Sequence, residues 1–247
     1  MSLDSTMRSN QPAALADRIA SYAWPELEAA LDANGSARLP QLLEPARCRE
    51  LRALYAEPEL FRSQVIMARH GYGLGEYQYF ARPLPGPIAQ LRQALYPRLA
   101  PLANRWSERL RQDTRFPASL PELEAMCAAR GQTQPTPLIL KYVAGGENRL
   151  HQDLYGDLAF PMQVVVLLSD PTREFRGGEF VLTEQRARMQ SRVEVVPLTQ
   201  GDAAIFAVND RPIAAKRGDT RVKMRHGVSR VHEGERYTLG IIFHDAR

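Results

Sequence analysis

The chain has 247 residues and a formal net charge of +4, with 44% hydrophobic and 24% charged residues. This composition is typical of a single globular domain with its own apolar core. The sequence has no run of about 18 apolar residues and no basic leader before an apolar run, which excludes a membrane-spanning helix, so we expect a cytoplasmic protein with no membrane partner.

The N-terminal half predicts helices around a short β-hairpin. Residues 1–12 are polar, and we predict that they are disordered. The predicted helices share apolar residues at helical spacing and cover 13–23, 26–33, a segment that begins at 44, 88–110 and 122–130. The predicted hairpin strands cover 61–67 and 76–80. Cys48 and Cys127 have no paired spacing, so we expect two buried free thiols rather than a disulfide.

The longest helical pattern, 88–110, contains Pro97 and Pro101. Because proline lacks a backbone donor and crowds the preceding turn, we predict that these residues kink the helix or split it in two. The helices within about 13–137 should pack on the outside of a sheet and support the face opposite the functional site.

From about residue 138 the pattern changes to short strands separated by turns rich in glycine, proline and aspartate. The predicted strands cover 164–168, 179–182, 193–196, 203–208, 221–226 and 236–243. Such a series indicates an antiparallel sandwich or barrel. We therefore predict a mainly β chain with helices (α+β), in which one domain over 13–247 has a jelly-roll core at about 138–247.

A short polar motif, His151-Gln152-Asp153, lies at the start of this β region. Side chains at i and i+2 of an extended strand point the same way, so the imidazole and the carboxylate converge. An isolated motif of this kind is more often a surface histidine than a metal ligand. If the fold brings His226 alongside, however, two histidines and one carboxylate form the ligand set of non-haem Fe(II) oxygenases.

From about residue 138 onwards the chain resembles the 2-oxoglutarate and Fe(II)-dependent dioxygenases, in particular their prolyl 4-hydroxylase-like branch. That branch has a jelly-roll core, also called a double-stranded β-helix. The matching landmarks follow in order as Tyr142, Gly145-Gly146, His151 and Asp153, the strand 164–168, Gly177-Gly178, Pro197, Gly201-Asp202, His226, Gly234 and Arg236. Several landmarks in one order are far more specific than any one of them.

The resemblance implies a role for each matching residue. His151, Asp153 and His226 would bind Fe(II), and Arg236 would pair with the distal carboxylate of 2-oxoglutarate. Tyr142 would also reach this co-substrate. Thr238 shares a strand face with Arg236 and is a second candidate donor to the same carboxylate. We do not expect His70, His232 or His244 to be ligands.

The implied reaction consumes 2-oxoglutarate and O2, forms succinate and CO2, and hydroxylates a C–H bond of the substrate. Demethylation is the same reaction when the hydroxylated carbon is bound to a heteroatom. Two other classes remain open: a non-catalytic jelly-roll metal-binding module, and a zinc hydrolase. Neither class has a use for the Arg236 landmark.

The substrate is the least constrained part of the prediction. Between residues 211 and 230 there are seven Lys or Arg residues and a single acid, Asp219. We expect the loop 209–220 to border the entrance, where a basic rim would suit a polyanion. However, no nucleic-acid-binding motif is present, and Arg236 follows His226 with the spacing of the protein hydroxylases. We therefore rank a protein or peptide residue ahead of damaged nucleic acid and leave the oligomeric state open.

Overall fold

The computed structural model describes residues 11–216 and 218–247, and every contact below is among these residues. The predicted disorder of residues 1–10 lies outside this range, whereas Gln11 and Pro12 begin the first helix. The α-helices are α1 (Gln11–Ser21), α2 (Trp24–Asn34), α3 (Pro45–Ala53), α4 (Gly86–Arg109) and α5 (Leu120–Ala128). Short 3₁₀ helices are η1 (Leu54–Ala56), η2 (Pro58–Leu60) and η3 (Met67–His70).

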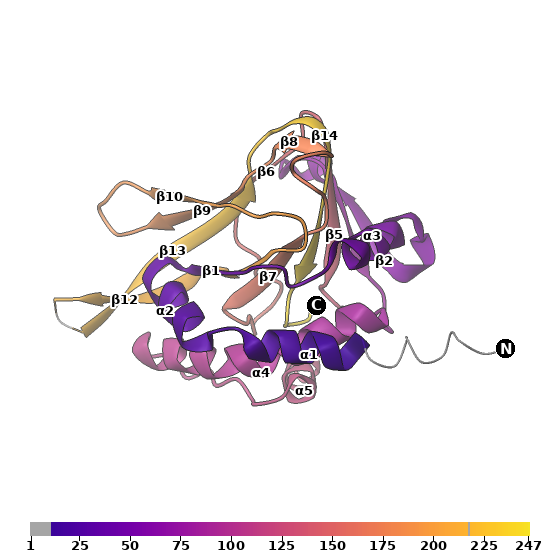
Figure 1. Cartoon of the computed structure of the whole chain (residues 1–247). Helices are drawn as coiled ribbons and strands as arrows, with labels where there is room; N and C mark the ends of the chain where they lie inside the picture. The colour runs from indigo at the N-terminus through magenta and orange to yellow at the C-terminus, as the bar shows by residue number, and fades with distance from the viewer. Residues whose placement is uncertain (1–10, 217) are drawn as a thin grey trace.

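Two antiparallel sheets form the β part of the chain (Figure 1). The larger sheet has the order β1-β11-β7-β14-β5-β4-β2, with β8 beside β14. Its strands are β1 (Ser36–Leu39), β2 (Phe61–Ile66), β4 (Glu76–Phe80), β5 (Leu138–Val143), β7 (Met162–Leu167), β8 (Phe175–Gly177), β11 (Ala203–Ala207) and β14 (Val231–Ile241).

The smaller sheet has the order β10-β9-β13-β6-β3, with β12 beside β13. Its strands are β3 (Gly73–Leu74), β6 (Glu147–His151), β9 (Phe180–Gln185), β10 (Arg192–Val196), β12 (Asp210–Ala215) and β13 (Gly218–Val228). The hairpins β9–β10 and β12–β13 project together from one side of the molecule in Figure 1. This arrangement confirms the predicted jelly-roll core with helices outside it.

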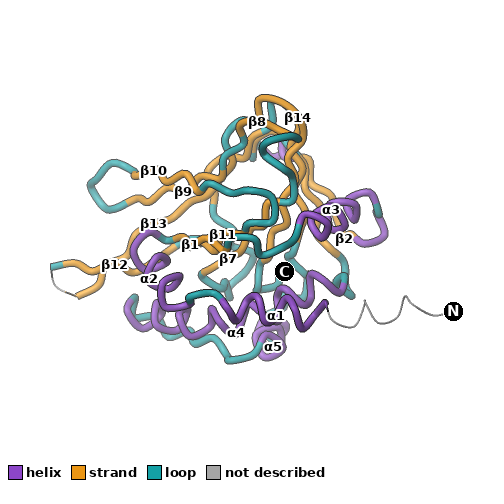
Figure 2. The backbone as a smooth tube through the Cα atoms, in the orientation of Figure 1, coloured by secondary structure: helices purple, strands orange, loops and turns teal. Residues whose placement is uncertain are grey.

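The helices cover one face of the larger sheet, as Figure 2 shows. Alternate residues of β14 explain this packing, because Leu239 and Ile241 belong to the same buried apolar cluster as Leu95 and Leu99 of α4. The other face of β14 carries Arg236, Thr238 and Gly240, which line a cavity between the two sheets. Cys48 and Cys127 are buried free thiols, as predicted. Among the described residues, no helix has the length and apolar character that a membrane span requires.

The predicted break in the longest helix is wrong, because α4 runs without interruption from Gly86 to Arg109. Pro97 and Pro101 are four residues apart and both are exposed, so they lie on the solvent side of the helix. Water can satisfy the carbonyl groups that lose their partners there. The buried side holds the helix in place through apolar contacts with the sheet, which outweigh the unfavourable propensity of proline.

The predicted loop at 209–220 is also wrong, because β12 pairs with β13 over most of this segment. None of the residues of β12 lines the cavity between the sheets. The last strand begins at Val231 rather than at the predicted residue 236, so His232 lies within β14. Residue 217, one of the seven basic residues of the stretch, lies outside the described residues.

Arg211 is not part of a basic rim, because its side chain is fully buried. It pairs with Glu184 of β9 and donates hydrogen bonds to the carbonyl groups of Asp32 (2.6 Å) and Ala33 (3.0 Å) in the last turn of α2. A cation that satisfies these carbonyl groups also complements the negative end of the helix dipole. Arg211 therefore joins the N-terminal helices to the smaller sheet.

The exposed basic residues of β13 point away from the functional face of the strand. Arg221, Lys223 and Arg225 alternate with buried Val222, Met224 and His226. Arg221 and Lys223 also pair with Asp210, at 3.2 Å and 3.0 Å. Because side chains alternate along the strand, these charges point away from the cavity, and they do not form the basic rim that we predicted at its entrance.

We predict that Arg211→Met lowers the free energy of unfolding by about 1–3 kcal/mol, because Glu184 loses its buried partner and two carbonyl groups of α2 lose a donor, while Arg186 still pairs with Glu184. Urea unfolding measures this change. Arg225→Met is the matched control on the exposed face of β13 and should unfold at the wild-type midpoint. Equal midpoints for the two variants would show that the pair does not hold the helices to the sheet.

Candidate metal centre and its cavity

Two adjacent strands of the smaller sheet place the two histidines of the motif side by side. His151 is the last residue of β6, and it is directly opposite His226 of β13 in the strand register. The pairing of β6 and β13 becomes irregular immediately after His226. A Cβ atom at Gly227 would lie 2.6 Å from the carbonyl oxygen of Asn148, so only glycine permits this close approach of the strands.

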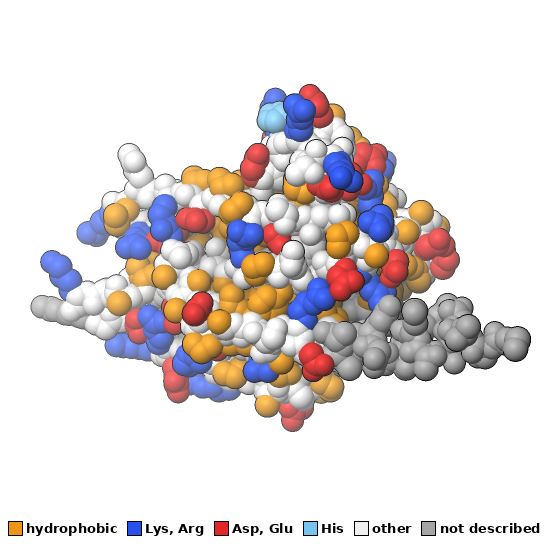
Figure 3. All heavy atoms as spheres, in the orientation of Figure 1, with side chains coloured by type: hydrophobic (Ala, Val, Ile, Leu, Met, Phe, Trp, Pro, Cys, Tyr) orange, Lys and Arg blue, Asp and Glu red, His pale blue; other side chains and the backbone are white. Residues whose placement is uncertain are grey.

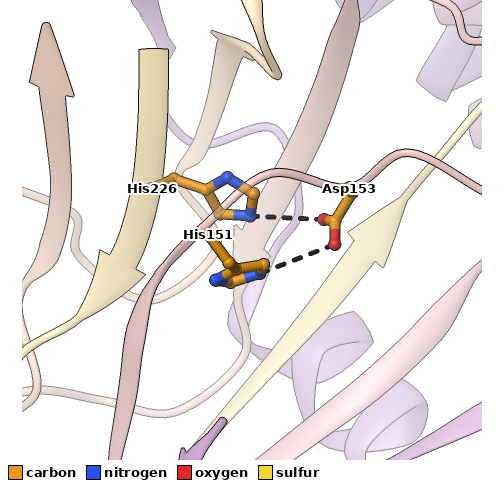
Figure 4. Close-up of side chains that lie close together, drawn as sticks. All are labelled: His151, Asp153 and His226. Atoms are coloured by element: carbon orange, nitrogen blue, oxygen red, sulfur yellow. Dashed lines mark ion pairs between the residues drawn. The ribbon is translucent and has the colours of Figure 1, made fainter. Parts of the chain in front are cut away.

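Asp153 lies just beyond the end of β6 and turns its carboxylate toward both imidazoles (Figure 4). Its Oδ2 atom is 3.3 Å from Nε2 of His226, and its Oδ1 atom is 3.5 Å from Nε2 of His151. One ligand atom from each residue lies within 4.8 Å of the others. The structure therefore brings the three predicted residues together around one point.

Neighbouring groups fix the orientation of these side chains. The Nδ1 atom of His151 lies 2.7 Å from the carbonyl oxygen of Arg149, so Nδ1 carries the proton and Nε2 presents its lone pair. The His226 ring packs against Phe206, with 4.7 Å between ring centroids. The hydroxyl group of Tyr155 donates a hydrogen bond of 2.7 Å to Asp153.

The protonation states suit metal binding. Burial opposes ionisation of Asp153, but its interactions with His226, His151 and Tyr155 outweigh burial and hold the pKa well below its usual value. Burial, together with the neighbouring His226, lowers the pKa of His151. At neutral pH the site therefore offers a charged carboxylate and a neutral imidazole at His151, the forms that coordinate a metal.

The three residues line a cavity of about 620 Å³ between the sheets. Its wall on the larger sheet includes Arg236 and Thr238 of β14, Tyr142 of β5 and Gln163 of β7. Its wall on the smaller sheet includes His226 of β13 and Phe180 of β9. Phe206 of β11 belongs to the larger sheet, and its ring packs next to His226. A cavity of this volume has room for a small dicarboxylate together with part of a second molecule.

Arg236 is the most unusual charged group in this cavity. It is 2% exposed, forms no ion pair among the described residues, and has no hydrogen-bond partner there for Nε or Nη1. Burial lowers its pKa to about 10, so the guanidinium is still charged at neutral pH. An unpaired buried charge opposes folding, and its presence in a cavity wall indicates a binding site for an anion.

The groups around Arg236 leave room for this side chain. Gly178 has a φ of +65°, and a Cβ atom there would lie 2.8 Å from Cδ of Arg236. The ring of Tyr142 lies 5.7 Å from the guanidinium carbon, and its hydroxyl accepts a hydrogen bond of 3.2 Å from Asn148. Burial raises the pKa of Tyr142, so it remains a neutral phenol beside the cation.

Three of the five histidines lie apart from the triad. His70 stacks on Tyr72, His232 is exposed in β14, and His244 is buried, where it accepts a hydrogen bond from the backbone of Phe160. Sequence reasoning missed Tyr155, Asn148 and Gln163, which also line the cavity. These residues carry no motif, and only their strand or loop position brings them to the site.

The fold is that of the 2-oxoglutarate and Fe(II)-dependent oxygenases. A prolyl-4-hydroxylase from Pseudomonas putida matches with a TM-score of 0.54 and 15% identity, over 91% of this chain and 99% of its own. An oxidoreductase of the 2OG-Fe(II) oxygenase family from Burkholderia pseudomallei matches with a TM-score of 0.54 and 16% identity, over 92% and 96% of the two chains. At such identities the likeness concerns the fold.

Residues 75–246 match the Oxygenase-NA family, described as an oxygenase catalysing oxidative methylation of damaged DNA, and the chain belongs to this family. Two Mycobacterium tuberculosis proteins, Uncharacterized protein Rv2227 of strain H37Rv and Uncharacterized protein MT2286 of strain CDC 1551 / Oshkosh, are each 49% identical over 167 residues. The match covers 68% of this chain and 72% of theirs. The predicted class, an oxygenase of the 2-oxoglutarate and Fe(II)-dependent type, is confirmed.

Proposed function

We propose that His151, Asp153 and His226 hold Fe(II) in this oxygenase and that Arg236 binds the distal carboxylate of 2-oxoglutarate. The observation that carries the proposal is that the convergent triad and the unpaired buried guanidinium line the same cavity. A non-catalytic metal-binding module or a zinc hydrolase would account for the triad alone. Only a reaction with an anionic co-substrate also accounts for Arg236.

The residues fit both groups by their chemistry. Two imidazoles and one carboxylate suit Fe(II) and leave coordination positions open for other ligands. When bound, Fe(II) supplies O2 activation coupled to oxidative decarboxylation of 2-oxoglutarate to succinate and CO2. Arg236, with Thr238 and Tyr142 beside it in the cavity wall, would orient the co-substrate, and the apolar side chains of Phe180 and Phe206 would exclude water.

We predict that His226→Ala abolishes stoichiometric Fe(II) binding and substrate-dependent succinate formation, because two remaining ligands cannot keep the facial arrangement. Anaerobic equilibrium dialysis measures the bound iron. The matched control is His232→Ala, because His232 is an exposed histidine of β14 in the larger sheet, and this variant should bind iron like the wild type. Full iron affinity in the His226 variant would refute the assignment of the triad.

For Arg236→Ala we predict a KM for 2-oxoglutarate at least about tenfold higher, because a charge-assisted pair worth about 1.5–3 kcal/mol is lost. Fe(II) affinity should stay near that of the wild type, since the ligands are unchanged. Arg236→Lys should recover part of the loss, and exposed Arg230→Ala serves as the control. An unaltered KM in the Ala variant would place the anchor on another residue.

The substrate we propose is a methylated base of nucleic acid, with oxidative demethylation as the reaction. Hydroxylation of an N-methyl group gives a hemiaminal, which releases formaldehyde and leaves the N–H form of the base. The family description, which concerns damaged DNA, supports this choice over the protein or peptide residue that the sequence ranked first. The spacing between His226 and Arg236, which led us to rank a peptide substrate first, concerns the residue proposed to bind the co-substrate. It carries no information about the substrate.

The side chains at the entrance of the cavity favour a substrate with an unpaired base over intact duplex DNA. Tyr72 is half exposed and stacks on His70, with 5.3 Å between ring centroids and 22° between ring planes. Exposed Leu150 and Leu154 also line the cavity, and Arg149 is anchored beside Tyr72 by a hydrogen bond to Gly71. A supported aromatic ring next to a basic side chain is a suitable platform for stacking one base.

Charge should contribute less than base stacking to the affinity for nucleic acid. Basic and acidic side chains alternate over the face that Figure 3 shows, without a continuous basic patch. Arg211 is buried, and Arg221 and Lys223 pair with Asp210. Because these three basic residues already have acidic partners, we expect few phosphate contacts from them and a shallow dependence of the affinity on salt.

We predict that Tyr72→Ala weakens binding of a single-stranded oligonucleotide with one methylated base by about 5- to 150-fold, in line with about 1–3 kcal/mol per stacked base. Tyr72→Phe should bind like the wild type. Fluorescence anisotropy over a salt series, with the Fe(II) and 2-oxoglutarate complex kept anaerobic, measures both the affinity and its slope. Turnover of peptides together with no oligonucleotide binding at low salt would restore the peptide ranking.

A further inference from the structure

Gln163 is a buried amide that the proposed site does not yet use. It lies in β7, is 3% exposed and lines the cavity between the sheets. Its Nε2 atom is buried and has no hydrogen-bond partner among the described residues. Asn/Gln amides carry two donors on nitrogen and an acceptor oxygen, so an unused buried amide in a cavity wall is a ready contact for a polar ligand.

Another buried glutamine shows what a structural amide looks like in this fold. Gln132 donates to the carbonyl groups of Leu158 (2.9 Å) and Asp245 (2.6 Å) and accepts from the backbone of Leu158 (2.9 Å). Its amide is therefore used on both sides to join backbone segments. Gln163 has none of these contacts, so protein packing does not explain an amide at this position.

The strand register places Gln163 and Arg236 at opposite ends of the cavity. Thr238 pairs with Leu167 in the strand register. Arg236 is two positions from Thr238 along β14, and Gln163 is four positions from Leu167 along β7. Arg236 and Gln163 are therefore separated by roughly 20 Å along the strands, at about 3.3 Å per residue. Gln163 is opposite Phe206, whose ring packs on His226. His226 therefore lies close to the Gln163 end of the cavity, whereas Arg236, the proposed anchor of the co-substrate, lies at the other end.

We propose that Gln163 is a specificity-determining residue, whose amide hydrogen-bonds the polar edge of the nucleobase that the enzyme oxidises. The proposal rests on the function proposed above and names what recognises its substrate. An adenine or cytosine edge presents an amino donor beside a ring-nitrogen or carbonyl acceptor, and a primary amide complements such a pair. The aromatic side chains of Phe206 and Tyr155, which also line the cavity, would enclose the base.

The test compares Gln163→Met with Gln132→Met, because methionine has a similar length and no polar group. The Gln163 variant removes an amide that no protein group satisfies, so it should raise Tm by about 2–4 °C. It should also raise the KM for a single-stranded oligonucleotide with one N-methyladenine by about tenfold or more, with unchanged Fe(II) affinity and an unchanged KM for 2-oxoglutarate. Gln132→Met should lower Tm and, where it folds, leave the oligonucleotide KM unchanged.

A second variant, Gln163→Glu, keeps the shape of the side chain but removes both N–H donors. It should also raise the oligonucleotide KM and change the order of preference among methylated adenine and methylated cytosine probes. A lower Tm for Gln163→Met, or an oligonucleotide KM equal to that of the wild type, would overturn the role of Gln163 while the wild type still forms succinate. A wild type that binds neither Fe(II) nor 2-oxoglutarate would instead overturn the proposed function, and this role with it.

Discussion

The guanidinium of Arg236 is buried in the cavity wall without a carboxylate beside it, and the surrounding fold must outweigh the unfavourable free energy of this arrangement. The compensation comes from the opposite face of the same strand. Leu239 and Ile241 belong to the apolar cluster formed with α4, so β14 is held firmly while it presents an unpaired cation to the cavity. The helical half of the chain thus helps to hold the strand that carries this charge.

Strand register is the second constraint on the site. His151 and His226 face each other across β6 and β13, and a slip of one residue would turn either imidazole to the other side of the sheet. Gly227 permits the close approach of the strands next to His226. Neighbouring strands in the same sheet, β9 and β13, pair over six consecutive positions and fix this register from the other side. The metal geometry therefore depends on backbone pairing more than on contacts of the ligands themselves.

The same alternation explains how much could be predicted from the sequence. The period of two residues placed His151 near Asp153 and Arg236 beside Thr238, and apolar strands placed the core correctly. Exposure of Pro97 and Pro101 on α4, and burial of Arg211 against Glu184 and α2, depend on contacts between segments far apart in the chain. No local pattern distinguishes a buried arginine from an exposed one, so the basic stretch of 211–230 suggested a rim that the fold does not form.

Arg236 and Gln163 differ from two other buried polar residues, Arg92 and Gln132, in the contacts of their side chains. Arg92 and Gln132 are as deeply buried, but Arg92 pairs with Glu124 and Gln132 bonds to the backbone, so each joins parts of the fold. Arg236 and Gln163 instead have donors without a partner among the described residues, and both residues line the cavity that contains the triad. Folding alone would favour apolar residues at both positions. Ligands bound at the two ends of the cavity would account for both residues, which agrees with a reaction between a small co-substrate and a larger substrate.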